Sequence, residues 1–230
     1  MLRSLPRGHA EPTSSRSSPP GSGRELATVT VPIEPRIVSA STASSAADAA
    51  DVTAHFNTKW RGKITSVALV PNLRGAESAL AAGVDWMNFV ISASVDHNMA
   101  NTRRTVEESI EELKKVCALK GETKLRLSVA TSFACPFAGD VPSEKVVRVV
   151  DACLEAGIDG VTLCDTIGTT DPKYLANTLT EMRTRYGDYP FALHLHDTHG
   201  MALANMLTAL RMGFSSFDAA AGGLGGCPFA

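Results

Sequence analysis

Two histidines separated by a single residue are the side chains of this sequence best placed to do chemistry. His194 and His196 lie at the end of the run FALHLH, whose apolar residues predict a β-strand. Alternate side chains of a strand share a face, so we expect both imidazoles to project together from the end of this strand. Neutral imidazole is a common metal ligand, and the pair is therefore a candidate metal half-site. The structural alternative is that one histidine packs in the core while the other bonds a neighbouring loop.

Asp165 and Cys227 are two further candidates. Asp165 ends a predicted strand in CDTIG, the position from which barrel enzymes project catalytic side chains, and it could equally cap the next turn through its carboxylate. Cys227 follows a run of glycines in GGLGGCP. Glycine backbone freedom would let this thiol-bearing loop approach a ligand closely, although the same loop could be a simple turn. Cys153 and Cys164 lie on apolar faces and are expected to be buried and inert.

The elements that must position these residues alternate regularly from Ile64 onward, with each short apolar run followed by an amphipathic segment. The predicted strands are 65–70, 86–92, 125–132, 161–164, 191–196 and 216–219; the predicted helices are 76–82, 105–119, 143–156, 171–186 and 201–212. Repeated β-α-β units imply a parallel sheet. Without a dinucleotide-binding glycine motif, they favour a (β/α)8 TIM barrel. A further strand at 27–33 and a helix at 40–54 still leave the barrel one strand short.

The N-terminal part differs in composition from the remainder. Residues 1–24 hold six Ser, four Pro and four Arg but one acid, which does not support a packed core. We expect this segment to be a disordered tail or, because Arg-rich, Ser-rich and acid-poor composition is typical of import signals, a mitochondrial transit-like segment. Residues 25–59 are poorly defined, with a candidate barrel strand and helix. Residues 60–230 are predicted to form the barrel domain, which is partial.

Composition and motif searches exclude several functional classes. The 22 Lys and Arg against 24 Asp and Glu provide no field for nucleic acid, and no apolar run approaches the ~20 residues of a membrane helix. The motifs GxxxxGK[ST], GxGxxG, GxSxG and HExxH do not occur. The five cysteines are scattered without a CxxC pair, which fits a reducing compartment. We therefore expect a small-molecule partner, with no nucleic acid and no membrane.

Four segments together carry a family resemblance: VPNLRGAESALAAG (70–83), CDTIGTTDP (164–172), LHLHDTHGMALAN (193–205) and AGGLGGCPFA (221–230). In this order and at these spacings they resemble hydroxymethylglutaryl-CoA lyase. The segment GGLGGCP separates the lyases from the related isopropylmalate and homocitrate synthases. The resemblance extends from about Pro35, and more closely from Ile64, to the last residue.

This resemblance implies a TIM-barrel enzyme that uses Mg²⁺ or Mn²⁺ to cleave 3-hydroxy-3-methylglutaryl-CoA into acetoacetate and acetyl-CoA, as in leucine degradation and ketone body formation. It implies that His194 and His196 bind the metal, with His194 near enough to shuttle protons. It also implies that Asp165 helps to position the substrate and that Cys227 acts as an acid or base. The implied partner is a CoA thioester, and the implied assembly is a homodimer in the mitochondrial matrix or the cytoplasm.

The sequence departs from the family pattern near both ends. The Arg-Asp pair that ends the family's first strand, and supplies a metal carboxylate, is not recognisable. The stretch 32–52 aligns with the family's second strand and helix, which places Glu34 at an acidic position and makes it a candidate catalytic residue. The family's Asn ligand would follow Ala230. We therefore expect a chain truncated at both ends, and two alternatives stay open: a non-catalytic remnant that binds a CoA thioester, and a synthase of the isopropylmalate or homocitrate type.

Overall fold

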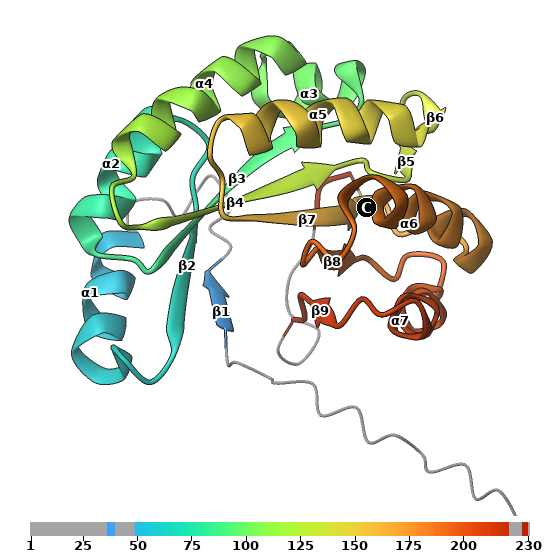
Figure 1. Ribbon diagram of the computed structural model, residues 1–230. Helices are drawn as coiled ribbons and strands as arrows, with labels where there is room; N and C mark the ends of the chain where they lie inside the picture. The colour runs from blue at the N-terminus through green and yellow to red at the C-terminus, as the bar shows by residue number, and fades with distance from the viewer. Residues whose placement is uncertain (1–35, 40–48, 221–226, 230) are drawn as a thin grey trace, which may run out of the picture. The chain divides into compact units, whose positions relative to one another are not determined.

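A parallel sheet organises the chain in the computed structural model, which describes residues 36–39, 49–220 and 227–229 (Figure 1). All of these residues belong to one compact unit. Its strands follow the order β1-β2-β3-β4-β7-β8-β9, and each neighbouring pair is parallel. Their bounds are β1 Arg36–Ser39, β2 Thr65–Leu69, β3 Trp86–Ser92, β4 Lys124–Ala130, β7 Gly160–Asp165, β8 Ala192–Leu195 and β9 Ser216–Phe217. Within the described residues the sheet stays open at β1 and β9.

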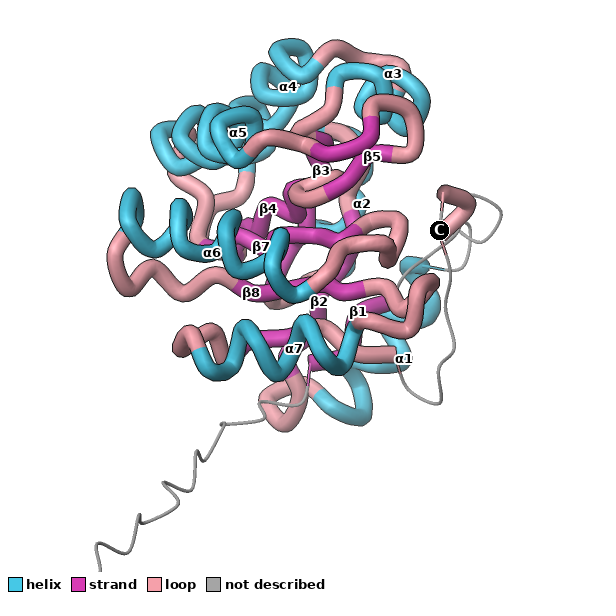
Figure 2. The backbone as a smooth tube through the Cα atoms, turned by 90° about the vertical axis from the view of Figure 1, so that its right-hand side faces the viewer, coloured by secondary structure: helices cyan, strands magenta, loops and turns pink. Residues whose placement is uncertain are grey.

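Helices connect successive strands and lie on the outer side of the sheet (Figure 2). Their bounds are α1 Ala49–Trp60, α2 Leu73–Ala82, α3 Val95–Thr102, α4 Val106–Leu119, α5 Ser143–Glu155, α6 Pro172–Tyr186 and α7 Ala202–Arg211. Side-chain hydrogen bonds to free backbone N–H groups cap the N-termini of α4 and α6. Thr105 and Glu108 form a capping box at α4, and the Asp171 side chain accepts the first free N–H groups of α6. No helix in the described part of the chain is long and apolar enough to cross a membrane.

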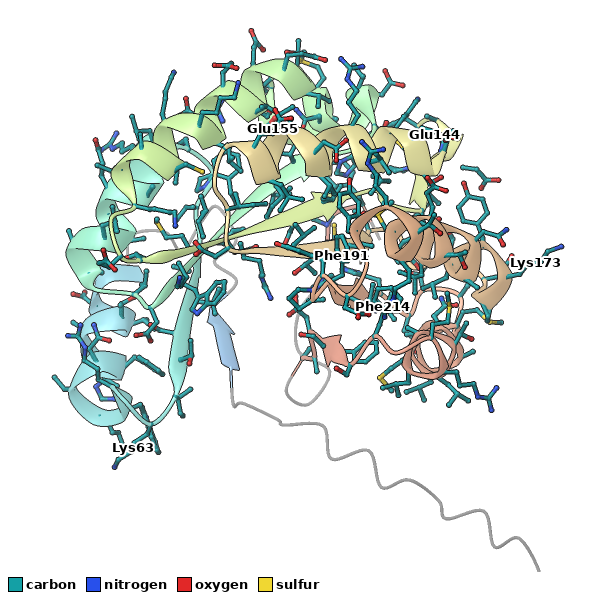
Figure 3. The ribbon with its side chains drawn as sticks, viewed as in Figure 1. Lys63, Glu144, Glu155, Lys173, Phe191 and Phe214 are labelled. Atoms are coloured by element: carbon teal, nitrogen blue, oxygen red, sulfur yellow. The ribbon has the colours of Figure 1, made fainter. Side chains whose placement is uncertain are left out.

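The two faces of the central strands differ in chemistry. The outer face is apolar and packs under the helices; its fully buried side chains include Met87, Phe89, Leu125, Leu127, Val161 and Leu163. The inner face carries buried polar groups, namely Asn88, Arg126, Ser128 and Thr162. Near the last helices, Phe191 and Phe214 lie in the interior, whereas charged side chains such as Lys173 project outward (Figure 3). A polar inner face is unusual for a packed barrel core and marks where chemistry can occur.

The structure adds elements that the sequence patterns did not predict. Helix α3 is one, and the short antiparallel pair β5 (Ala134–Cys135) and β6 (Gly139–Asp140) is another. Helix α3 lacks a regular apolar stripe and is held by its buried Asn98, whose amide donates to the Arg104 and Thr105 carbonyls. Helix α1 runs on to Trp60, past the predicted end at residue 54. The strand predicted at 27–33 lies outside the described residues.

Candidate functional site

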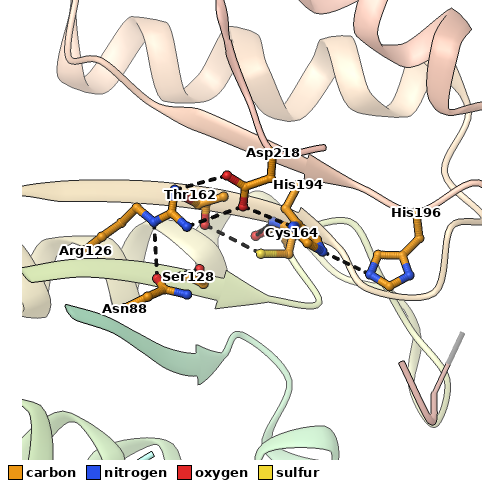
Figure 4. Close-up of polar contacts among 9 residues, drawn as sticks. Asn88, Arg126, Ser128, Thr162, Cys164, His194, His196 and Asp218 are labelled. Atoms are coloured by element: carbon orange, nitrogen blue, oxygen red, sulfur yellow. Dashed lines mark hydrogen bonds and ion pairs between the residues drawn. The ribbon is translucent and has the colours of Figure 1, made fainter. Parts of the chain in front are cut away.

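The structure brings His194 and His196 together at the carboxyl end of β8. Their side chains share the inner face, since they are two positions apart, and their Nε2 atoms lie 3.1 Å from each other (Figure 4). Burial lowers the pKa of His196, and the neighbouring His194 lowers it further. This imidazole is therefore neutral at neutral pH, which is the form that binds metals.

Asp218 engages the far side of the His194 ring. The residue follows β9 and is anchored beside β8, because its backbone N–H donates to the Leu193 carbonyl at 2.9 Å. Its Oδ2 then lies 3.1 Å from His194 Nδ1. Burial opposes ionisation of Asp218, but the hydrogen bond with His194 and the charge of Arg126 outweigh it, so its pKa is lowered. Asp218 is therefore a carboxylate that accepts hydrogen bonds.

Arg126 on β4 pairs with this carboxylate from inside the sheet. Its Nη1 lies 3.1 Å from Oδ1 of Asp218 and its Nη2 lies 3.4 Å from Oδ2. Its Nε donates to Asn88 Oδ1 at 3.3 Å, and the same oxygen accepts from Ser128. The Asp218 carboxylate compensates the charge of this buried arginine, and Asn88 accepts the hydrogen bond from its other side. A polar chain thus crosses the inner face from β3 to β8 and ends at the two imidazoles (Figure 4).

The donor set of the imidazole pair fits a divalent cation as a half-site. Two ligands at right angles on an octahedral ion with bonds of about 2.1 Å lie about 3.0 Å apart, close to the separation of the two Nε2 atoms. In the described part of the chain, no group of three or more His, Cys, Asp or Glu side chains could hold a metal. Among the described residues, the pair could therefore provide two nitrogen ligands of a larger coordination sphere.

Asp165 ends β7, but its carboxylate turns away from the imidazole face. It pairs in register with Leu195, whereas Cys164 pairs with His194. Its Oδ2 accepts from the Thr170 backbone N–H at 3.2 Å, so it caps the β7–α6 turn. Burial raises its pKa, and the backbone N–H groups of that turn only partly offset this. Its Oδ1 is buried and has no partner among the described residues. Asp165 still adjoins the pair through its carbonyl, which accepts from the His196 N–H at 3.4 Å.

The turn that follows Asp165 packs directly against the loop that carries His196. Gly168 has φ +64°, and a Cβ there would lie 2.7 Å from the Thr198 backbone nitrogen. Its carbonyl accepts from the His199 N–H at 2.9 Å. This close approach explains the glycine of CDTIG, because a side chain would push the β8–α7 loop away.

Cys227 is half-buried, and no hydrogen bond joins it to either imidazole within the described residues. Phe229 lies two residues after Cys227, and its ring packs edge-on against His97 with centroids 4.5 Å apart. His97 is buried, and its Nδ1 lies 2.7 Å from the Ser92 hydroxyl oxygen. The end of the glycine-rich segment therefore rests on α3. Residues 221–226 of that segment, and Glu34, lie outside the described residues.

Two other cysteines were predicted to be buried and inert, and their burial is confirmed. Cys153 and Cys164 are buried, and burial raises the pKa of each thiol to about 12. In contrast, sequence reasoning missed Asn88, Arg126 and Asp218. A signal existed for Arg126, since an arginine inside the apolar run LRLSV is rarely buried without a partner.

Comparisons with known proteins agree on one family. The family model described as HMGL-like matches residues 28–227. Hydroxymethylglutaryl-CoA lyase YngG of Bacillus subtilis is 45% identical over 169 residues, which make up 73% of this chain and 56% of that protein. (R)-citramalyl-CoA lyase of Chloroflexus aurantiacus is 39% identical over 165 residues, 71% of this chain and 52% of that protein. The chain thus spans about half the length of these relatives.

A solved structure gives the same result for the fold. An HMG-CoA lyase from Acinetobacter baumannii, in complex with coenzyme A and 3-methylmalate, matches with a TM-score of 0.75 at 38% identity. The match covers 80% of this chain and 60% of that one. The predicted TIM-barrel fold is confirmed, and the described residues form an open part of it.

Proposed function

Because this chain belongs to the HMGL-like family, we propose that it carries the metal-binding part of a divalent-metal-dependent carbon–carbon lyase. The observation that carries the proposal is the convergence of His194 and His196 at the carboxyl end of a parallel strand, with 3.1 Å between their Nε2 atoms. In barrel enzymes this end of the sheet is where active sites lie. The glycine-rich segment with Cys227 also ends beside α3, after the carboxyl end of β3.

The proposed substrate is 3-hydroxy-3-methylglutaryl-CoA, and the products are acetoacetate and acetyl-CoA. Support comes from the relatives named HMG-CoA lyase and from the solved relative that holds coenzyme A. Because one relative is named citramalyl-CoA lyase, citramalyl-CoA is the alternative substrate to consider. In both cases the partner is a CoA thioester.

The proposed reaction is a retro-Claisen cleavage. A base takes the proton of the tertiary hydroxyl, and the oxygen's electron pair forms the new ketone of acetoacetate. The broken carbon–carbon bond leaves its electrons on the thioester fragment, and an acid then protonates that carbon to give acetyl-CoA. A divalent cation, when bound, supplies Lewis-acid stabilisation of the alkoxide.

We assign metal binding, proton transfer and substrate positioning to different residues according to their geometry. His194 and His196 hold the cation through Nε2. Because His194 Nδ1 is engaged by Asp218, we assign His194 to the metal rather than to proton transfer. The Cys227 thiol is assigned to proton transfer, as acid or base. Asp165 is proposed to help position the substrate indirectly, because its carboxylate caps the turn that lies beside His196. Glu34 is assigned to the family's acidic position on the second strand.

The finer features of the proposal concern the ion, the assembly and the compartment. Oxygen donors must complete the coordination sphere, and this favours Mg²⁺ or Mn²⁺ over softer ions. We propose a homodimer, as the family resemblance implies. For its compartment we propose the mitochondrial matrix or the cytoplasm, which relatives named as mitochondrial and as cytoplasmic lyases support.

One observation favours a second candidate function. The described residues contribute only two metal ligands. A protein that binds a CoA thioester without cleaving it would fit that donor set. The two candidates differ in whether added metal produces turnover.

The experiment is acetyl-CoA release from 3-hydroxy-3-methylglutaryl-CoA by the purified 230-residue chain, with and without Mg²⁺ or Mn²⁺. Metal-dependent release that disappears in His196→Ala supports the lyase. Asp159→Asn is the matched control, because this carboxylate is tied to Lys120 and Lys124 away from the imidazoles. A folded chain that binds the thioester but releases no acetyl-CoA with either ion would overturn the lyase and favour the binding protein. The same assay with citramalyl-CoA as the substrate shows which of the two acyl groups the chain prefers.

A further inference from the structure

We propose that Asp218 is a positioning residue that fixes His194 in one tautomer, with the proton on Nδ1 and the Nε2 lone pair directed toward the metal position. This inference rests on the proposed metal role of the histidine pair. Arg126, held by Asn88, is assigned to keeping Asp218 in place. The chain of contacts joins β3, β4, the residue after β9 and β8, and it ends at the proposed cation ligand.

A proton lies between Asp218 and His194, and it belongs to the imidazole. Both oxygens of Asp218 accept from Arg126, so the carboxylate acts as an acceptor, and the 3.1 Å contact between Oδ2 and Nδ1 places the proton on Nδ1. A neutral imidazole carries one N–H. In the neutral form of the His194 ring, Nε2 is then a bare lone pair, and it faces Nε2 of His196 at 3.1 Å.

Arg126 and Asn88 hold the Asp218 carboxylate in place. Arginine has donors only, and two nitrogens of Arg126 face the two oxygens of Asp218. The Arg126 side chain is 5% exposed and that of Asp218 is 18% exposed, so solvent competes little for this pair. On its other side the guanidinium donates from Nε to Asn88 Oδ1. Neither member of the pair can rotate without losing a buried hydrogen bond.

The position of the proton on His194 determines what its Nε2 atom presents to a cation. In the opposite tautomer the Nε2 hydrogen would point toward His196, and it would occupy the position that a shared cation needs. Asp218 therefore decides whether His194 offers a lone pair or an N–H toward the cation position. Without a cation, His196 is then the donor of the contact between the two Nε2 atoms, and its proton must leave that nitrogen when a cation binds. A carboxylate that orients a metal-binding histidine commonly changes metal affinity by about 10–100-fold when it is removed.

The most direct test uses the unmodified chain. Long-range ¹H–¹⁵N correlation spectra of the ¹⁵N-histidine-labelled protein at pH 8, without metal, distinguish the Nδ1–H from the Nε2–H tautomer. The His194 signal is identified by its loss in His194→Gln. We expect the Nδ1–H tautomer, and an Nε2–H tautomer as the main form would overturn the inference.

The variant Asp218→Asn provides a second test. Arg126 attracts the amide oxygen, so the NH₂ group faces His194 Nδ1, which must then accept and lose its proton. We expect the tautomer to reverse and the Kd for Mn²⁺ to rise about 10–100-fold. Asp159→Asn is the matched control; it also removes a carboxylate that accepts from cations, and it should leave both readouts unchanged.

The failure of this inference can be distinguished from failure of the proposed function. If the wild-type chain does not bind Mn²⁺, or His194→Gln binds it equally well, the metal role of the pair is wrong. If His194→Gln loses Mn²⁺ while a folded Asp218→Asn keeps wild-type affinity, only the positioning role of Asp218 is wrong. If Asp218→Asn does not fold, the tautomer of the unmodified chain decides.

Discussion

Gly168 approaches His196 so closely that a Cβ added at Gly168 would lie 2.9 Å from the His196 carbonyl carbon. The contact joins the turn after β7 to the loop after β8, and it is reinforced by the hydrogen bond from the His199 N–H to the Gly168 carbonyl. Gly168 has φ +64°, a conformation that residues with side chains rarely adopt. The position of one proposed metal ligand therefore depends on a glycine in the neighbouring turn.

Replacement of Gly168 by alanine should move His196. The added methyl would collide with backbone atoms of the His196 loop, which can relieve the contact only by moving the loop. We expect Gly168→Ala to weaken Mn²⁺ binding by at least about 10-fold, comparable to loss of an orienting partner. Isothermal titration calorimetry with Mn²⁺ measures this.

Gly157→Ala is the matched control for this prediction. Gly157 also has positive φ, at +90°, but a Cβ there would meet no atom within 4 Å. We expect it to lose about 1–2 kcal/mol of unfolding free energy through backbone strain and to keep Mn²⁺ affinity. Equal Mn²⁺ affinities for the two variants would contradict the role given to Gly168.

Cys227→Ala should slow turnover rather than weaken substrate binding. Removal of a general acid or base typically costs about 10²–10⁴-fold in rate, and the thiol is not assigned to ground-state binding. Steady-state kinetics should therefore show a lower kcat with a nearly unchanged KM. Cys117→Ala, at another half-buried free thiol, should retain wild-type kcat. An unchanged kcat in Cys227→Ala would remove the thiol from the mechanism.

Phe229→Ala should loosen the turn that carries Cys227. The edge-on contact with His97 contributes about 0.5–1.5 kcal/mol, and alanine lacks it. We expect Cys227 to be alkylated faster, as measured by peptide mass spectrometry, with Cys117 as the internal reference. Phe229→Tyr keeps the ring and should react like the wild type. A Cys227 alkylation rate that is the same in Phe229→Ala and wild type would show that this contact does not restrain the thiol.

Asp159→Asn should destabilise the fold in a pH-dependent way. Burial raises the pKa of this carboxyl, but hydrogen bonds from Lys120, the Leu125 N–H and Lys124 outweigh it, and the pKa is lowered. A lowered folded-state pKa means that stabilisation is present above the unfolded value, near 3.9, and disappears as pH falls through the folded value. We expect a loss of about 1–3 kcal/mol at pH 7 that shrinks below pH ~4. Urea unfolding at pH 7, 5 and 3 measures it, and a constant difference would contradict this origin.

Periodicity allowed part of this structure to be predicted. The alternation of strands and helices from Ile64 predicted the parallel order of the sheet, and the period of two along a strand predicted that His194 and His196 share a face. Both predictions depend on spacing within one element, which a sequence displays directly.

Contacts between distant segments could not be predicted in this way. Arg126 and Asp218 are 92 positions apart, and nothing in either neighbourhood specifies the other. The orientation of Asp165 depends on the following turn, because the Thr170 backbone N–H donates a hydrogen bond to its carboxylate. Helix α3 is stabilised by the buried amide of Asn98 rather than by an apolar stripe, so the periodic pattern that predicts helices is weak there.

The central claim is that the two imidazoles of β8 bind the catalytic cation, and pulsed EPR of bound Mn²⁺ tests it most directly. Electron spin echo modulation detects ¹⁴N nuclei of imidazoles that are bonded to the ion. The account predicts ¹⁴N modulation in the wild-type chain that weakens in His196→Ala and disappears when His194→Ala is added, with Asp159→Asn unchanged. Bound Mn²⁺ without ¹⁴N modulation, or modulation that persists in the double variant, would contradict it.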